Sequence, residues 1–292
     1  MGESAYSMGE WTSADGLTLR YRDYPGAGEL GADRPPVLCI PGLTRNCRDF
    51  EPVADALAGE WRVICVDLRG RGQSDYARNS ASYQPLQYAA DVLALLDHLA
   101  LPRVVMVGTS LGGIVIMLLA LTAPGRIAAA LLNDVGPEIE AAGLARIREY
   151  VGQGRSFPTW MHAARGLKDQ AGVAYPDFRL ADWLRLAKRL MAVGPGGRIA
   201  FDYDMKIAEP FQAPAGAAPA FDMWPAFRAL AGVPLLVVRG ELSDILSAAT
   251  LERMKREAPA LDAVTVERTG HAPTLEEPAA QQAIARLLAK VV

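Results

Sequence analysis

The sequence has almost no excess of charge of either sign. Its 292 residues include 30 lysines and arginines and 33 aspartates and glutamates, so the net charge is -3 at neutral pH. A strong positive field is what draws a protein to nucleic acid or to an anionic membrane. We therefore expect neither of these partners, and the sequence leaves the oligomeric state open.

Cysteine is scarce, with three residues, an odd number. Cys39 and Cys65 lie inside apolar runs of strand type, and Cys47 lies between these two runs. No Cys and His spacing resembles a zinc site. This pattern predicts buried, reduced thiols in a cytoplasmic protein without a metal.

Long apolar runs are also missing. The run from Ile114 to Ala123 is too short to cross a bilayer, and it stops at Pro124-Gly125. The stretch from Met1 to Trp11 is polar and lacks the apolar core of a signal peptide, which again favours the cytoplasm. With 51% hydrophobic residues, a chain of this length forms one large domain with an insertion, or two small domains.

Apolar segments of strand type alternate with helical segments over much of the chain. The expected strands span 11–13, 17–24, 36–40, 62–67, 104–107, 127–132, 234–238 and 263–267, and the expected helices span 50–57, 86–99, 114–123, 248–257 and 279–291. Asp15-Gly16 between the first two strands is a hairpin signal. The remaining alternation predicts an α/β fold with a mostly parallel, doubly wound sheet flanked by helices.

The alternation stops between about Pro137 and Pro225. Helical pieces at 144–151 and 180–191 are visible there, and a stretch rich in glycine, alanine and proline follows. A long interruption between strands of one sheet is typical of a lid over a site. We expect a core formed by residues 1–136 and 226–292 and a mainly helical cap formed by residues 137–225.

The segment Gly108-Thr109-Ser110-Leu111-Gly112 has the pattern Gly-x-Ser-x-Gly. The five residues alone are weak evidence, because a glycine-rich strand-to-helix turn matches them equally well. Here a strand-like segment precedes the serine and a helical segment follows it, which is the setting of a nucleophile elbow. Such a turn lifts the serine hydroxyl clear of the sheet and directs helix N–H groups at a developing oxyanion. Ser110 is our candidate nucleophile.

Gly70 and Gly72 occupy a second glycine-containing loop, at residues 68–75. A phosphate cradle is the alternative interpretation, but the full dinucleotide fingerprint is missing and no Lys-Ser/Thr follows. We interpret the loop as a turn and expect no cofactor.

A serine nucleophile needs a base, and the chain has only three histidines. His98 lies at the end of an amphipathic helix, and His162 lies in the irregular insertion, where exposure is the simpler expectation for both. His271 follows the last strand, at the carboxyl edge of the sheet that also carries Ser110. We therefore assign His271 as the candidate base.

The base needs a carboxylate that orients it, and three acids follow strands at the same edge. Asp244 lies past the strand 234–238, and Asp134 lies past the strand 127–132. The chain order Ser–acid–His fits both aspartates equally. We favour Asp244, with Asp134 as its rival and Glu241 as a weaker third.

The oxyanion needs two N–H donors. The backbone N–H of Leu111, next to the nucleophile, is the first candidate, and that of Leu43, in the loop after the strand 36–40, is the second. Arg45 in the same loop and Trp160 in the cap are candidates for substrate contact. The aromatic residues of the insertion serve either the pocket wall or the core of the cap; besides Trp160 they are Tyr175, Phe201, Tyr203 and Trp224.

Together, the serine pattern, the stretch from Asp67 to Ser74, Asp244 and Gly270-His271 resemble the α/β-hydrolase superfamily. The resemblance covers nearly the whole chain, with residues 137–225 in place of the variable cap. It implies an α/β-hydrolase fold and a Ser–His–Asp triad of Ser110, His271 and Asp244. Within the superfamily, the chain is similar to small bacterial esterases, lactonases and carbon–carbon bond hydrolases.

The sequence departs from parts of that group. Carbon–carbon hydrolases usually have an asparagine before the nucleophile and an aromatic residue after the histidine, where this chain has Thr109 and Ala272-Pro273. Pro41-Gly42 stands where many relatives have His-Gly, which changes the pocket wall. We expect a serine hydrolase that cleaves a small or medium carboxylic ester or lactone. The alternatives are carbon–carbon hydrolysis of a ring-cleavage diketone acid and a slow-turnover ligand receptor.

Overall fold

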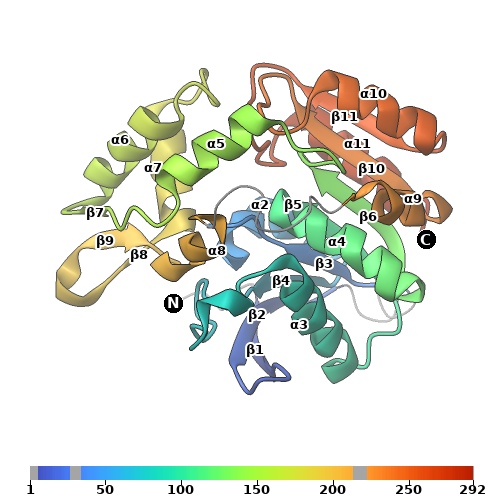
Figure 1. Cartoon of the computed structure of the whole chain (residues 1–292), viewed down its shortest axis with the longest axis horizontal. Helices are drawn as coiled ribbons and strands as arrows, with labels where there is room; N and C mark the ends of the chain where they lie inside the picture. Colours follow the sequence, from blue (N-terminus) through green and yellow to red (C-terminus); the bar gives the residue numbers. More distant parts are fainter. Residues whose placement is uncertain (1–5, 27–33, 213–221, 292) are drawn as a thin grey trace.

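A computed structural model describes residues 6–26, 34–212 and 222–291 of the chain, which are organised around an eight-stranded sheet (Figure 1). The order across the sheet is β1-β2-β4-β3-β5-β6-β10-β11. The pairs β1–β2 and β2–β4 are antiparallel, and the strands from β4 to β11 are parallel. The strands are β1 (Ser7–Thr12), β2 (Thr18–Tyr24), β3 (Val37–Ile40), β4 (Val63–Asp67), β5 (Val104–Thr109), β6 (Ile127–Asn133), β10 (Leu235–Gly240) and β11 (Asp262–Val266).

Helices cover both faces of this sheet. One apolar cluster joins the sheet to α3 (Pro85–His98), α4 (Leu111–Thr122), α9 (Trp224–Arg228) and α10 (Ala248–Glu257). A second cluster on the other face joins it to α2 (Glu51–Leu57) and α11 (Pro278–Leu288). Short 3-10 turns complete the connections: η1 (Cys47–Phe50), η2 (Ser80–Ser82), η3 (Pro124–Arg126) and η6 (Ala229–Gly232). The predicted doubly wound α/β architecture is confirmed.

The central strands are apolar along their whole length because both of their faces are covered. Every residue of β3, β4, β5 and β6 is buried. The three cysteines are buried and free, as the apolar runs predicted. Parallel strands place all their carboxyl ends at one edge of the sheet, and this edge is where the candidate site lies.

The described part of the insertion between β6 and β10 is mainly helical, and we call residues 137–225 the cap. Its helices are α5 (Ala141–Tyr150), α6 (Trp160–Ala171), α7 (Leu180–Leu190) and α8 (Glu209–Gln212), with 3-10 turns η4 (Pro195–Gly197) and η5 (Met205–Ala208). Figure 1 shows most of the cap, in green to yellow, to one side of the sheet. Residues 213–221 of this segment lie outside the described residues.

The cap also contains a small antiparallel sheet that the sequence did not predict. Its strands are β7 (Ser156–Phe157), β8 (Met191–Val193) and β9 (Ile199–Phe201), in the order β7-β9-β8. Strands this short cannot show a period of two. The chain turns between β8 and β9 at Gly196 and Gly197, whose φ angles of 81° and 76° suit glycine.

The cap has an apolar core of its own, between α6 and α7. Tyr175 stacks on Phe178 with 4.6 Å between ring centroids, and both rings meet Trp183 edge-on. Trp160 and Phe201 pack against this cluster from its margin. These residues therefore stabilise the cap as a separate packing unit.

Trp224 does not belong to that unit. It is buried in the main core, and its Nε1 donates to Glu138 at 2.7 Å. The guanidinium of Arg253 lies 3.7 Å from the centre of its ring. Glu138 and Trp224 stand where the chain enters and leaves the cap, so these contacts close the base of the insertion rather than line a pocket.

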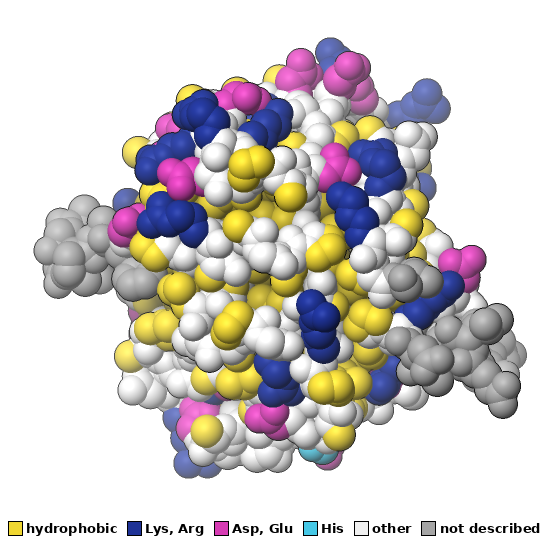
Figure 2. Space-filling view, turned by 90° about the vertical axis from the view of Figure 1, so that its right-hand side faces the viewer, with side chains coloured by type: hydrophobic (Ala, Val, Ile, Leu, Met, Phe, Trp, Pro, Cys, Tyr) yellow, Lys and Arg dark blue, Asp and Glu magenta, His cyan; other side chains and the backbone are white. Residues whose placement is uncertain are grey.

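The surface carries mixed charge. On the face shown in Figure 2, lysines and arginines lie among aspartates, glutamates and apolar atoms. This mixture on that face agrees with the small net charge of the sequence. No helix among the described residues is long and apolar enough to cross a membrane.

Candidate active site

Ser110 stands at the turn from β5 into α4, at the carboxyl edge of the sheet. Its backbone angles are φ 51° and ψ -112°, a region that residues other than glycine rarely occupy. The Ser110 N–H donates to the carbonyl of Asn133 at the end of the neighbouring strand β6, at 2.9 Å. The strained turn expected of a nucleophile elbow is therefore present at the predicted residue.

The two glycines of the serine pattern are required by close packing. A Cβ on Gly108 would lie 2.4 Å from the carbonyl carbon of Gly112, and a Cβ on Gly112 would lie 2.0 Å from the carbonyl oxygen of Ile40. Both distances are too short for real atoms, so β3, β5 and α4 can approach this closely only with glycine at both positions.

His271 reaches Ser110 from the loop after β11. Its Nε2 lies 2.9 Å from Ser110 Oγ, and its side chain is 9% exposed. The structure thus brings together the two residues that the sequence pairs as nucleophile and base. His98 and His162 are exposed elsewhere, and His162 bonds to Thr159 within the cap.

The acid beside His271 is Asp134. Its Oδ2 lies 2.7 Å from His271 Nδ1 and accepts the hydroxyl of Ser243 at 2.6 Å, while its Oδ1 accepts the N–H of Gly240 at 2.9 Å. The carboxylate is fully buried. The prediction that Asp244 orients the histidine is wrong, and the rival aspartate holds this place.

Strand order explains the difference. β6 lies between β5 and β10, so the end of β6 is beside Ser110, and the loop from β11 passes over it on its way to the serine. Asp134 follows the last residue of β6 directly, whereas Asp244 comes four residues after Gly240, the end of β10. At that point the chain meets the cap, where Asp244 pairs with Arg146 instead of the histidine.

Asp244 has a different partner. Its two carboxylate oxygens accept from Nε and Nη2 of Arg146 in the cap helix α5, at 2.5 Å and 2.8 Å. This guanidinium lowers the pKa of Asp244. Gly143 allows the contact, because a Cβ there would lie 2.2 Å from the Asp244 carbonyl oxygen. The third candidate, Glu241, is exposed and accepts from the N–H of Arg268.

The loop after β3 carries Leu43 and is held in place by a buried arginine. Arg71 has no exposed surface, and its Nε donates to the Leu43 carbonyl at 2.9 Å. Its Nη1 donates to the hydroxyl of Tyr88, whose ring lies under the guanidinium at 4.7 Å. Leu111, the other predicted donor, is the first residue of α4, a position whose N–H has no partner inside the helix.

Arg45 joins the loop after β3 to the cap residue Tyr175. Its stem lies over Gly42, where a Cβ would be 3.8 Å from the arginine Cγ and 3.6 Å from the Thr109 carbonyl oxygen. Its Nη1 bonds to both oxygens of Asp49, and its Nη2 reaches the Tyr175 hydroxyl at 3.4 Å. The side chain is 17% exposed. Burial disfavours its charge, but Asp49 and Tyr175 outweigh burial and raise its pKa.

Two polar residues of the site were missed by the sequence analysis. Asn133 Nδ2 donates to Thr109 Oγ1 at 3.1 Å and to the Pro273 carbonyl at 2.9 Å, so it ties the nucleophile strand to the histidine loop. Ser243 supports the acid. Asn133 directly precedes Asp134. Two adjacent polar residues at the end of an apolar strand were the signal that could have placed this strand end in the site. Trp160, by contrast, packs on the cap cluster.

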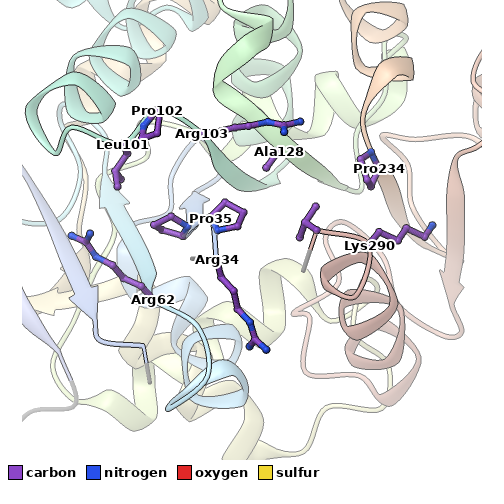
Figure 3. Close-up of a pocket in the computed structure, with 11 residues that line it drawn as sticks. Arg34, Pro35, Arg62, Leu101, Pro102, Arg103, Ala128, Pro234 and Lys290 are labelled. Carbon is purple, nitrogen blue, oxygen red and sulfur yellow. The ribbon is translucent and has the colours of Figure 1, made fainter. Parts of the chain in front are cut away.

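A cavity of about 590 Å³ lies far from this chemistry. Pro36, Arg103 and Pro234 line it, and they stand just before β3, β5 and β10, at the amino ends of the strands. Figure 3 shows that the basic side chains around it point in different directions, and Arg62 is already paired with Asp23. This cavity is therefore not the site of catalysis.

The comparisons with known proteins agree with the geometry. The sequence profile of the alpha/beta hydrolase family matches residues 37–283. The crystal structure of an alpha/beta hydrolase from Novosphingobium aromaticivorans is 59% identical, with a TM-score of 0.94, over 99% of this chain and 100% of that one.

Two curated enzymes are similar over most of their length. The 3-hydroxybutyrate-oligomer hydrolase of Cupriavidus necator is 35% identical over 83% of this chain and 84% of that enzyme. The 2-(acetamidomethylene)succinate hydrolase of Mesorhizobium japonicum is 29% identical over 87% of this chain and 85% of that enzyme. On the profile, the shared fold and these similarities, the chain belongs to the alpha/beta hydrolase family.

Proposed function

We propose that this hydrolase cleaves a small or medium-sized carboxylic ester or lactone through an acyl-enzyme intermediate. The observation that carries the proposal is one continuous line of hydrogen bonds, from Ser110 Oγ to His271 Nε2 and from His271 Nδ1 to Asp134. Nucleophile, base and orienting acid in this order are the requirements of acyl transfer by a serine.

The mechanism follows from these positions. Ser110 Oγ attacks the ester carbonyl carbon while His271 Nε2 accepts its proton, and the buried Asp134 holds the imidazole and stabilises its cation. The N–H groups of Leu43 and Leu111 bind the negative oxygen that develops. His271 then gives the proton to the departing alcohol. A water molecule, deprotonated by the same histidine, attacks the acyl carbon. The bond to Ser110 Oγ then breaks, His271 returns the proton to Ser110, and the acid is released.

The substrate class can be narrowed by Arg45. The contacts described above engage Nη1 with Asp49 and one N–H of Nη2 with Tyr175. A guanidinium has five N–H groups, so Arg45 has further donors for an oxygen of a ligand. Its stem and the Thr109 carbonyl both lie beside Gly42, and its Nη2 lies near the Tyr175 hydroxyl that bonds to Ala272, so we expect it to reach a carboxylate near the scissile bond. The two curated relatives are named for a hydroxybutyrate oligomer and a succinate, both of which carry carboxylates. A short oligoester of a hydroxy acid meets both conditions.

Carbon–carbon hydrolysis is the alternative within the enzymes. It requires that a dienol acid first be protonated on carbon, and polar groups near the serine must hold that intermediate. Thr109 Oγ1 already accepts a hydrogen bond from Asn133 Nδ2, and Ala272 has no polar side chain. This chain therefore has fewer polar groups near the serine to hold such an intermediate. We expect esters to be preferred by at least about tenfold in kcat/KM, a difference of about 1.4 kcal/mol.

One set of steady-state measurements tests the proposal. The substrates are p-nitrophenyl butyrate, a lactone, a ring-cleavage diketone acid, and a 3-hydroxybutyrate dimer with its methyl ester. Ser110→Ala should lose about three to six orders of magnitude in turnover, and a fluorophosphonate should label Ser110. Fast cleavage of the diketone acid with poor ester turnover would contradict the proposal. One equivalent of product followed by almost no turnover would favour the receptor.

Arg45→Gln tests the carboxylate within the same measurements. The variant should lose about tenfold on the free acid of the dimer and little on its methyl ester. Arg103→Gln, at the opposite edge of the sheet, is the matched control. Equal losses on acid and methyl ester would mean that Arg45 supports the fold of the loop rather than the substrate.

A further inference from the structure

The cap holds the loop of the candidate base on both sides of His271. The Gly270 N–H donates to the carbonyl of Ala174 at 2.6 Å, and the Tyr175 hydroxyl donates to the carbonyl of Ala272 at 2.7 Å. Ala174 and Tyr175 are neighbours in the cap, between α6 and α7. One short cap segment therefore bonds to the residue before the histidine and to the residue after it.

The contact is close as well as polar. A Cβ on Gly270 would lie 2.8 Å from both Cα and Cβ of Ala174, so the backbone of the cap lies directly on the backbone of the histidine loop. No side chain fits between them. The register of the cap against this loop is thereby determined sterically as well as by hydrogen bonds.

The tyrosine that makes one of these bonds is itself immobilised. Tyr175 is 4% exposed, stacks on Phe178 and meets the edge of Trp183 inside the apolar core of the cap. Its hydroxyl also lies 3.4 Å from Nη2 of Arg45. The Tyr175 hydroxyl therefore moves only when the whole cap moves, because its ring is fixed in the core of the cap.

The core supplies the other supports of the loop. Thr269 accepts from the N–H of Leu242 at 2.9 Å, and Pro273 accepts from Asn133 at 2.9 Å. These bonds lie outside the two made by the cap, which are the ones adjacent to the histidine. A base displaced by about 1 Å can lose about a hundredfold in rate, so among these supports of the loop backbone the inner two matter most for the position of the imidazole.

We propose that Tyr175 is a positioning residue for His271, so that the cap takes part in the chemical step as well as in the choice of substrate. The inference rests on the proposed serine hydrolase mechanism. When Tyr175 loses its hydroxyl, the Ala272 carbonyl loses its donor and the imidazole samples positions away from Ser110. Nη2 of Arg45 loses the same hydroxyl, so the effect on the chemical step is read on a substrate without a carboxylate.

The test is Tyr175→Phe, with Tyr203→Phe as the matched control. Tyr203 is equally buried, and its hydroxyl accepts the N–H of Gly152 within the cap, away from the histidine. On p-nitrophenyl butyrate, which has no carboxylate for Arg45 to bind, Tyr175→Phe should lower kcat per labelled serine by about 10- to 100-fold. It should leave KM within about twofold and shift the acid limb of the pH profile of kcat/KM. The rate of Ser110 labelling by a small fluorophosphonate should fall by the same factor. Tyr203→Phe should leave all four quantities close to those of the wild type.

Gly270→Ala is the second variant, because its Cβ forces the cap away from the histidine loop without removing the tyrosine. It should slow labelling at least as much as Tyr175→Phe does. The inference is overturned if the fluorophosphonate labels Ser110 in Tyr175→Phe at the wild-type rate. This holds even if the variant has a lower melting temperature or a higher KM. Failure of the proposed function is distinguishable: a wild type that labels at Ser110 but turns over no ester contradicts the function, and the labelling rates still test the positioning.

Discussion

Two neighbouring strands near His271 are each followed by an aspartate, and the two carboxylates have different partners. At the end of β6, Asp134 is fully buried and accepts hydrogen bonds from Gly240, Ser243 and His271. Past the end of β10, Asp244 is 35% exposed and paired with Arg146 of the cap. The comparison teaches that a carboxylate at the correct edge is not sufficient for a triad. Its role depends on which donors reach it.

The largest expected effect is at the buried carboxylate. Asp134→Asn should lower kcat by about 10⁴-fold, because an amide in that place favours the wrong tautomer of His271. Steady-state rates on p-nitrophenyl butyrate measure the loss, and circular dichroism checks that the variant is folded. A loss below about tenfold would show that the histidine does not depend on this aspartate.

An intermediate effect is expected at Ser243, which donates to the same carboxylate oxygen as the histidine. A hydrogen bond to a charged group contributes about 1.5–3 kcal/mol, so Ser243→Ala should lower kcat/KM by about tenfold or somewhat more. Ser247→Ala is the control, because Ser247 caps α10 by accepting from the Thr250 N–H. It should reduce the melting temperature without reducing the rate. Equal rate losses in the two variants would assign the effect of Ser243 to the stability of the loop.

The smallest effect is expected at Asp244. Asp244→Asn should change kcat/KM by less than about threefold, because the residue fastens the cap and does not touch the imidazole. Its free energy of unfolding should fall by less than about 1 kcal/mol at pH 7, because an ion pair this exposed is screened by solvent. A loss larger than that of Asp134→Asn would return the catalytic acid to the loop after β10.

The same pair predicts a pH dependence for stability. Arg146 lowers the pKa of Asp244 below its ordinary value of 3.8 in the folded state. The contribution of the pair is therefore fully present above about pH 4 and is lost as the pH falls through the lower, folded-state pKa. Urea unfolding of the wild type and Asp244→Asn should differ at pH 7 and converge once the pH falls below the folded-state pKa of Asp244. A difference that persists at the lowest pH would mean that packing, and not charge, is lost in the variant.

The parts of the site predicted from sequence are those with local signals. The serine pattern stands between a strand and a helix whose bounds lie within two or three residues of the prediction, at β5 and α4. His271 was identified because histidine is scarce and only one of the three follows a strand. The small cap sheet was missed because its strands have only two or three residues.

The choice between the two aspartates was wrong for a physical reason. Both follow parallel strands, and both lie between the serine and the histidine in the chain, so pattern and order are equal for them. What separates them is hydrogen-bond competition, and Arg146 lies 98 residues before Asp244 in the sequence. Nothing in the neighbourhood of either aspartate in the chain reveals that competition.

The sequence by itself determined the layered α/β core and identified the candidate nucleophile and the candidate base, because apolar periodicity and turn chemistry act over a few residues. Only the tertiary structure decided which acid lies beside His271 and what holds the histidine loop. Those outcomes depend on β6 lying between β5 and β10, and on the cap bringing Arg146 to Asp244 and Tyr175 to Ala272. Such contacts form between segments far apart in the chain, where strand order and packing, rather than local preference, select the partner of each polar group.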